Sequence, residues 1–254
     1  MTPPSLSYTI WFTQRNGSTL LTKAMEQMEI VGKPGEWLNI PVELSLSQHY
    51  QVGASGALLP VLYQQGMGKN GVYGQKVSMH GGGMIDWLEE LAQASGVKEG
   101  ANAGEIWEAA FPNHRYIFLT RRNKVRQAVS WWKAIQTQEW HRESGKEAIQ
   151  VPPALMDSYD FAAIRHLLTE ICLREAAIEE FFLRGNSQPM TIVYEDFVRE
   201  YEQTIRDILS FLGQDQQSVE IPSPPLERLA DEVSEVWVQR FREEIQDGWS
   251  SQVW

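Results

Sequence analysis

The feature that most constrains this fold is a pattern that recurs along the chain. In each case a short apolar run is followed by a segment whose apolar residues are spaced as in a helix. "YTIWFT" covers residues 8–13, and a polar loop joins it to apolar residues that recur at helical spacing over residues 20–28. "RYIFLT" at 115–120 and "MTIVYE" at 190–195 are followed by helical patterns in the same way. Strands that alternate with helices predict an α/β fold, with a mainly parallel sheet flanked by helices.

Other segments are predicted from the same patterns. Residues 72–79 form a strand candidate, and an amphipathic helix is predicted over residues 84–94. A long helix is expected from about residue 159 to 183, and one more helix follows the prolines of 222–225. Asp196 is a plausible N-cap for a helix that Gly213 closes. Residues 32–39 are a turn-rich connection, and residues 41–70 are expected to be irregular or to form short helices.

Length and composition favour one globular domain over residues 1–254, because no obvious repeat or long low-complexity tract divides the chain. No signal-like start and no run of about 18 apolar residues is found, which predicts a cytoplasmic protein without stable membrane insertion. The only cysteine, Cys172, excludes an internal disulfide and a cysteine-based metal site, and its apolar helical surroundings predict that it packs in the core.

The formal net charge of −11 argues against a protein that binds nucleic acid by broad phosphate neutralisation. Any anion that the chain binds must therefore be held by local groups. The positions of the arginines are thus more informative than their number.

The loop "TQRNGS", residues 13–18, has the parts of an anion cradle. A turn from a strand into a helix presents unpaired N–H groups and the positive end of the helix dipole. Gly17 lets an anion approach closely, Ser18 and Thr19 offer hydroxyls, and Arg15 offers a planar guanidinium. The loop is not a nucleotide-hydrolase P-loop, since Phe12 and Ser18 replace its first glycine and its lysine. An ordinary turn with an N-cap serine is the simpler alternative.

A second basic cluster follows the strand at 115–120. Arg121, Arg122, Lys124 and Arg126 stand where a helix begins, and the helix dipole disfavours positive charge there. A second bound anion would explain the cluster. A solvated basic helix start is the alternative.

The two segments "FTQRNGSTLL" and "FLTRRNKVRQAVSWWKAIQTQEWH" together resemble sulfotransferases that use 3′-phosphoadenosine 5′-phosphosulfate (PAPS), especially the bacterial trehalose 2-sulfotransferase family. The order of "GKPGEWLN", "YGQKVSMH", "IVYEDF" and "WVQRFREEI" also fits. The resemblance implies a P-loop-like sulfotransferase fold. It also implies PAPS as donor, 3′-phosphoadenosine 5′-phosphate (PAP) as product, and transfer without a metal.

The resemblance also implies roles for single residues. The 5′-phosphosulfate would be held by Arg15, Asn16, Gly17, Ser18 and Thr19, and Arg15 would stabilise charge on the leaving oxygen. Arg122, eight positions before Ser130, would hold the 3′-phosphate with it. The eukaryotic relatives close over this phosphate with an R-K-G tail motif that is absent here, and Arg240 or Arg242 are candidate substitutes.

On the acceptor side, the resemblance makes Glu36 in "GKPGEW" the first candidate for the base that accepts the hydroxyl proton. His80, with Lys76 nearby, is the competing candidate. Trp140 and His141 would line the acceptor pocket. The family suggests a small acceptor, a carbohydrate or glycolipid hydroxyl, and a homodimer; a hydroxyl or amine of a secondary metabolite remains an alternative acceptor.

Two other classes are weaker. The run "HGGG" at 80–83 is found in lipase oxyanion holes, but the chain has no G-x-S-x-G pentapeptide to supply the nucleophile. A kinase or a nucleotide-binding protein without sulfuryl transfer would be expected to bind ATP with Mg²⁺, and the absent P-loop lysine weighs against it.

Overall fold

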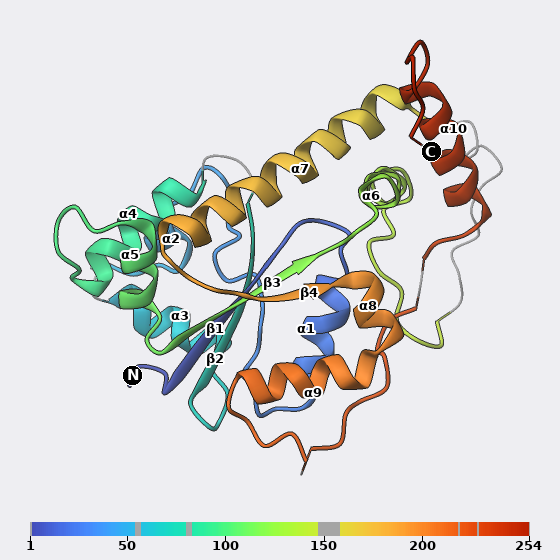
Figure 1. Ribbon diagram of the computed structural model, residues 1–254. Coiled ribbons are helices and arrows are strands. Elements are labelled where there is room, and N and C mark those ends of the chain that lie inside the picture. The colour runs from blue at the N-terminus through green and yellow to red at the C-terminus, as the bar shows by residue number, and fades with distance from the viewer. Residues whose placement is uncertain are drawn as a thin grey trace.

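The computed structural model describes residues 2–53, 57–79, 83–146, 158–217, 219–227 and 229–253 (Figure 1). The strands are β1 (Leu6–Phe12), β2 (Val72–Ser78), β3 (His114–Thr120) and β4 (Met190–Val193). The helices before β3 are α1 (Ser18–Gln27), α2 (Leu46–His49), α3 (Leu58–Gly66), α4 (Gly83–Ser95) and α5 (Ala103–Ala110). Those after it are α6 (Lys124–Thr137), α7 (Phe161–Arg184), α8 (Tyr194–Arg199), α9 (Tyr201–Phe211) and α10 (Glu232–Ile245).

The strands form one sheet in the order β2-β1-β3-β4, and every neighbouring pair is parallel. In the register, Ile10 of β1 lies between Lys76 of β2 and Ile117 of β3. All carboxyl ends therefore meet at one edge, where open α/β sheets bind ligands. The predicted parallel α/β fold is confirmed.

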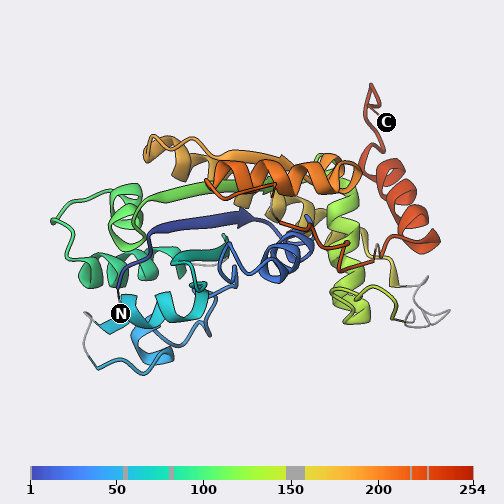
Figure 2. The same cartoon turned by 90° about the horizontal axis from the view of Figure 1, so that it is seen from below.

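Apolar residues on both faces of the sheet explain why the strands read as continuous apolar runs. On one face, β1, β3 and β4 pack against α1 and α9 around Tyr8, Ile10 and Ile205. On the other, Trp11 of β1 packs against α3, α4, α5 and the carboxyl half of α7. Both helical layers are visible beside the strands in Figures 1 and 2.

A third apolar cluster joins α6, α7 and α10, with Val129, Ile171 and Trp237 at its centre. In Figure 2, α6 and α10 lie beyond the end of the sheet toward which β1 points. The cluster thus fixes α6 and α10 next to the ligand-binding edge. Within the described part of the chain, no helix combines the length and the apolar character that a bilayer crossing needs.

Two expectations about single elements are corrected, and one helix had not been predicted. The predicted N-cap Asp196 lies in the first turn of α8, because that helix begins at Tyr194 directly after β4. Helix α5 was not anticipated, although Asn102 and Glu105 form a capping box at its start. Cys172 is exposed rather than in the core, because the buried stripe of α7 passes through its neighbour Ile171 and leaves Cys172 outside it. Gly213, at φ +66°, follows α9 as predicted.

A partly buried histidine at the opposite edge of the sheet makes stability depend on pH. His114 lies with Nδ1 at 2.8 Å from Ser7 Oγ, and its Nε2 accepts a hydrogen bond from Trp107 Nε1 at 3.2 Å. Burial, aided by the charge of Arg115, lowers the pKa of His114 to about 3. The neutral ring that the fold requires is therefore opposed by protonation of the unfolded chain below about pH 6.5.

We expect stability to decline as the pH falls from about 6.5 toward 3, with His114 contributing up to about 1.4 kcal/mol per pH unit. Thermal unfolding of the wild type and of His114→Gln, followed by circular dichroism between pH 5 and 7, measures this. His114→Gln should be less stable than the wild type at pH 7, but its stability should change less with pH. His166 is exposed, so the stability of the control His166→Gln should vary with pH as that of the wild type does. Parallel curves for wild type and His114→Gln would contradict the assignment.

Candidate functional site

The loop between β1 and α1 is held in a conformation that few residues adopt. Arg15 has φ +65° and Gly17 has φ +90°, both in the left-handed region. A Cβ on Gly17 would lie 2.5 Å from Tyr194 Cδ2, so a side chain there would clash as well as strain the backbone. Helix α1 then begins at Ser18, and among the described residues no side chain caps it. Its first N–H groups therefore point, without a side-chain partner, to a place where an anion could bind.

Arg15 links this loop to α6. Its Nε donates to Ser130 Oγ at 3.1 Å, its Nη1 donates to the carbonyl of Trp140, and its own carbonyl accepts from Arg121 Nη1 at 3.1 Å. Burial lowers the pKa of Arg15 to about 10, and the nearby charge of Arg121 acts in the same direction. The structure thus brings Arg15 and Ser130 together. The family resemblance assigns Arg15 to the 5′-phosphosulfate and Ser130 to the 3′-phosphate of the same PAPS molecule.

Asn16 has a different position. Its side chain is buried and donates to the carbonyl of Leu119 in β3. This bond fixes the loop to the sheet, and Asn16 does not line the cavity described next. The backbone of the loop, rather than the Asn16 side chain, faces the candidate site.

A cavity of about 590 Å³ opens at this edge, within the range typical of small-molecule sites. One wall is the start of α1 with Arg15, Gly17, Ser18 and Thr19. The second is one face of α6 with its N-cap, where the lining residues recur about once per helical turn. These are Asn123, Arg126, Val129, Ser130, Lys133, Ala134 and Thr137. In the described residues, no cluster of three His, Cys, Asp or Glu side chains is arranged to hold a metal.

The third wall is the connection that precedes α10, together with the start of that helix. Leu226, Leu229 and Val238 give it an apolar surface. The connection is tied to the rest of the molecule, because the amide of Glu227 donates to the carbonyl of Arg142 at 2.9 Å. Lys133 reaches the same wall, where its Nζ lies 2.5 Å from an oxygen of Asp231. The cavity is therefore polar on the side of α1 and α6 and apolar opposite.

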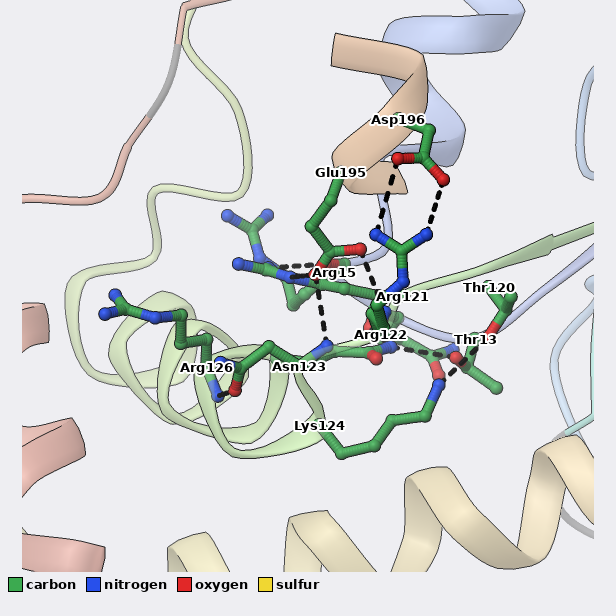
Figure 3. A network of polar contacts seen from close by, with 12 residues as sticks. Thr13, Arg15, Thr120, Arg121, Arg122, Asn123, Lys124, Arg126, Glu195 and Asp196 are labelled. Atoms are coloured by element: carbon green, nitrogen blue, oxygen red, sulfur yellow. Dashed lines mark hydrogen bonds and ion pairs between the residues drawn. The ribbon is translucent and has the colours of Figure 1, made fainter. Parts of the chain in front are cut away.

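The basic start of α6 is neutralised by carboxylates from other elements (Figure 3). Arg122 points to Asp196 of α8, with Nη2 at 2.5 Å from Oδ2, and is not among the residues that line the cavity. Lys124 pairs with Glu175 at 2.5 Å, and Arg126 pairs with Glu235. From the sequence alone, these positive charges are explained by a bound anion or by solvent. In the structure, each of the three is paired with a carboxylate of the protein.

Glu195 fills the N-terminus of α6 itself. Its two carboxylate oxygens accept from the amides of Arg122 and Asn123, at 2.9 and 3.1 Å. Burial alone raises the pKa of Glu195, but these amides and the charge of Arg121 lower it on balance. The carboxylate therefore stays ionised in the place that a bound phosphate would otherwise take.

The candidate base Glu36 is paired. Its Oε1 lies 3.0 Å from Lys76 Nζ, and its Oε2 accepts from Asn39 Nδ2 at 2.9 Å. A parallel bridge between Gly35 and Gln75 holds this segment against β2. The sequence placed Lys76 with His80, whereas the structure places it on Glu36; His80 lies outside the described residues. Glu36 does not line the cavity.

Trp140 and His141 follow the carboxyl end of α6 and do line the cavity. Trp140 is 41% exposed, and its backbone carbonyl accepts from Arg15. Partial burial lowers the pKa of His141, and the charges of Lys23, Arg15 and Lys76 add to this effect. The charge of Arg15 in the loop and the charge of Lys76, the partner of Glu36, therefore both act on His141.

Sequence reasoning missed Tyr194 as a cavity residue. Its ring covers Gly17 and lies 4.8 Å from the guanidinium of Arg121, which also lines the cavity. The tyrosine stands in the segment "IVYEDF", so its position after a strand was a usable signal. Neither Arg240 nor Arg242 lines the cavity, and Arg240 instead pairs with Glu244.

Comparison with known proteins gives a consistent result. The family model described as Stf0 sulphotransferase matches residues 7–244. The chain is similar to the trehalose 2-sulfotransferase of Mycolicibacterium smegmatis, with 26% identity over 94% of this chain and 96% of that protein. The corresponding figures for the trehalose 2-sulfotransferase of Mycobacterium tuberculosis are 27%, 93% and 94%. A sulfotransferase structure from Alicyclobacillus acidocaldarius matches with a TM-score of 0.50 and 13% identity, over 97% of this chain and 95% of that one, and supports the fold.

Proposed function

Because the chain belongs to the Stf0 sulphotransferase family and is thus a sulfotransferase, we propose that its cavity binds PAPS and that the sulfuryl group passes to a hydroxyl of a small carbohydrate. The observation that carries this proposal is the meeting of two anion-binding elements in one cavity. The uncapped start of α1 and the Ser130 face of α6 are joined there by Arg15.

The 5′-phosphosulfate is assigned to the loop. The amides of Gly17, Ser18 and Thr19 and the hydroxyls of Ser18 and Thr19 offer donors to its oxygens, and the dipole of α1 favours negative charge there. Arg15 adds a guanidinium whose partners are a hydroxyl and a carbonyl rather than a carboxylate. Such fixed donors can stabilise the charge that develops on the leaving phosphate oxygen.

The 3′-phosphate is assigned to the α6 wall, where Ser130 is available as a hydroxyl donor. The family motif also assigns Arg122 to this phosphate. Arg122 can contact this phosphate only after its ion pair with Asp196 breaks. Its side chain is 61% exposed, so it has room to change direction. In this assignment the binding of the donor rearranges at least one ion pair.

For the transfer step, the acceptor oxygen forms a bond to sulfur while the bond between sulfur and the bridging phosphate oxygen breaks, and PAP leaves. We assign the acceptor proton to the carboxylate of Glu36, with His80 as the competing candidate. Lys76 and Asn39 hold one carboxylate oxygen each, which fixes the orientation of Glu36.

The acceptor is assigned to the end of the cavity at Trp140 and His141. An exposed indole ring can stack on the apolar face of a sugar, and an imidazole can hydrogen-bond a hydroxyl. Both curated relatives are named for trehalose, which makes trehalose the first acceptor to test. A hydroxyl or amine of a secondary metabolite is the alternative, to be tested in the same assay.

We expect the protein to bind PAP in the presence of EDTA, and Ser130→Ala to weaken binding about tenfold, because a hydrogen bond to a charged phosphate is lost. Calorimetric titration measures both, with Ser95→Ala as a matched control, since Ser95 lies in the last turn of α4 and bonds only to the carbonyl of Ala92 among the described contacts. No binding of PAP together with Mg²⁺-dependent binding of ATP would favour a nucleotide-binding protein of another class.

A further inference from the structure

Arg126 is the α6 arginine that faces the cavity. It lies one helical turn before Ser130, on the same face, and both residues line the cavity wall. Arg122, which the family motif assigns to the 3′-phosphate, points instead to Asp196 (Figure 3). Arg126 therefore has the position for a phosphate ligand without any movement of the backbone.

The N-terminus of α6 is already occupied. Glu195 accepts from the amides of Arg122 and Asn123, so these two donors are already engaged by a carboxylate of the protein. The next positive charge along the cavity face is Arg126. Lys133 follows two turns later, but its side chain is 10% exposed and is bonded to both Asp231 and the carbonyl of Leu229.

Arg126 is held by a group that resembles a phosphate in geometry. Its Nη1 and Nη2 each donate to one oxygen of Glu235, the second at 2.7 Å, so the guanidinium fork is engaged by two oxygens of one planar anion. A phosphate presents oxygens at a similar spacing. Glu235 is 45% exposed and can turn toward solvent when another anion takes its place.

On the basis of the proposed function, we propose that Arg126 is a further donor-binding residue, which exchanges the carboxylate of Glu235 for the 3′-phosphate when the nucleotide binds. Glu235 belongs to the first turn of α10, and Ser234 and Val238 of the same helix line the cavity. The exchange therefore acts at the contact between α6 and the C-terminal helix. It gives the 3′-phosphate a second cation in a chain that lacks the R-K-G tail motif.

Two variants that break the same ion pair test this role. Arg126→Met removes the cation, whereas Glu235→Gln removes its competitor and leaves the cation in place. Calorimetric titration with PAP should show weakening of tenfold or more for Arg126→Met and tightening for Glu235→Gln. A purely structural ion pair predicts changes of the same sign in both variants, and that result would overturn the proposal.

Adenosine 5′-monophosphate identifies the phosphate involved, because it differs from PAP only by the missing 3′-phosphate. Its affinity should change less than twofold in Arg126→Met. The control Arg184→Met removes an exposed arginine of α7 that pairs with Glu180 and does not line the cavity, and it should change neither titration. Wild-type binding of PAP that Arg126→Met leaves unchanged would overturn this inference alone, and failure of the wild type to bind PAP would overturn the proposed function with it.

Discussion

Replacing Arg15 by methionine should lower kcat by about a hundred- to a thousandfold, the loss typical of removing a donor from a developing oxyanion. Arg15 places its guanidinium at the junction of the loop and α6, where it donates to the Ser130 hydroxyl and to the carbonyl of Trp140. Methionine keeps much of the apolar length of the side chain but removes every donor. The measurement is transfer of labelled sulfuryl from PAPS to trehalose, or to whichever hydroxylated acceptor shows wild-type turnover.

The controls for this prediction separate chemistry from folding. Arg15→Lys restores the positive charge but cannot donate from two positions to Ser130 and Trp140 at once, so it should recover only part of the activity. Arg199→Met removes an exposed arginine that pairs with Asp196 and Glu200, and should change kcat less than twofold. A loss below tenfold in a folded Arg15→Met protein would contradict the assigned role.

Glu36→Gln is the second large effect, a fall in kcat of about a hundred- to ten-thousandfold with the affinity for PAP unchanged. Glutamine keeps the shape of the side chain and an oxygen for Asn39, but it cannot take the acceptor proton. Steady-state transfer assays and calorimetric titration with PAP measure the two quantities separately. Glu29→Gln, which changes an exposed carboxylate paired with Lys69, is the matched control.

The two quantities also distinguish the alternatives. If Glu36→Gln retains activity, His80 becomes the leading candidate, and His80→Ala should then reduce kcat instead. If Glu36→Gln weakens PAP binding as much as it lowers kcat, the carboxylate supports the donor site rather than the proton transfer. This second outcome is worth measuring because Glu36 pairs with Lys76. Loss of the carboxylate leaves the ammonium group of Lys76 without this partner.

The part of the fold that could be predicted is the part encoded locally. Apolar runs such as "RYIFLT" identified the strands, because a parallel strand buried on both faces needs apolar residues at every position. Glycine, hydroxyl and arginine residues predicted an anion cradle on the same local basis, and the structure places Arg15, Gly17, Ser18 and Thr19 at one wall of the cavity. Helix α5 was missed although its capping box was readable, because it spans only eight residues, too few for a helical period to stand out in the sequence.

The direction of the arginine side chains could not be predicted, because their partners are distant in the sequence. Arg122 and Asp196 are 74 residues apart, and Arg126 and Glu235 are 109 residues apart. Local spacing places Arg121, Arg122, Lys124 and Arg126 at one helix start, but only the packing of α8 and α10 decides which of them faces the cavity. Glu36 and Lys76 were likewise singled out separately, and the bridge between Gly35 and Gln75 is what joins them.

The carboxylates that hold the cavity arginines have a consequence for association kinetics. Glu195 and Glu235 cancel positive charge that would otherwise extend into solvent, and the chain as a whole carries a net charge of −11. An anionic nucleotide is therefore not drawn in from a distance, so it should associate at an unsteered rate, on the order of 10⁵–10⁶ M⁻¹s⁻¹. In the proposed exchange, attraction begins only at contact, when the ligand's phosphates replace the carboxylates that pair with the arginines.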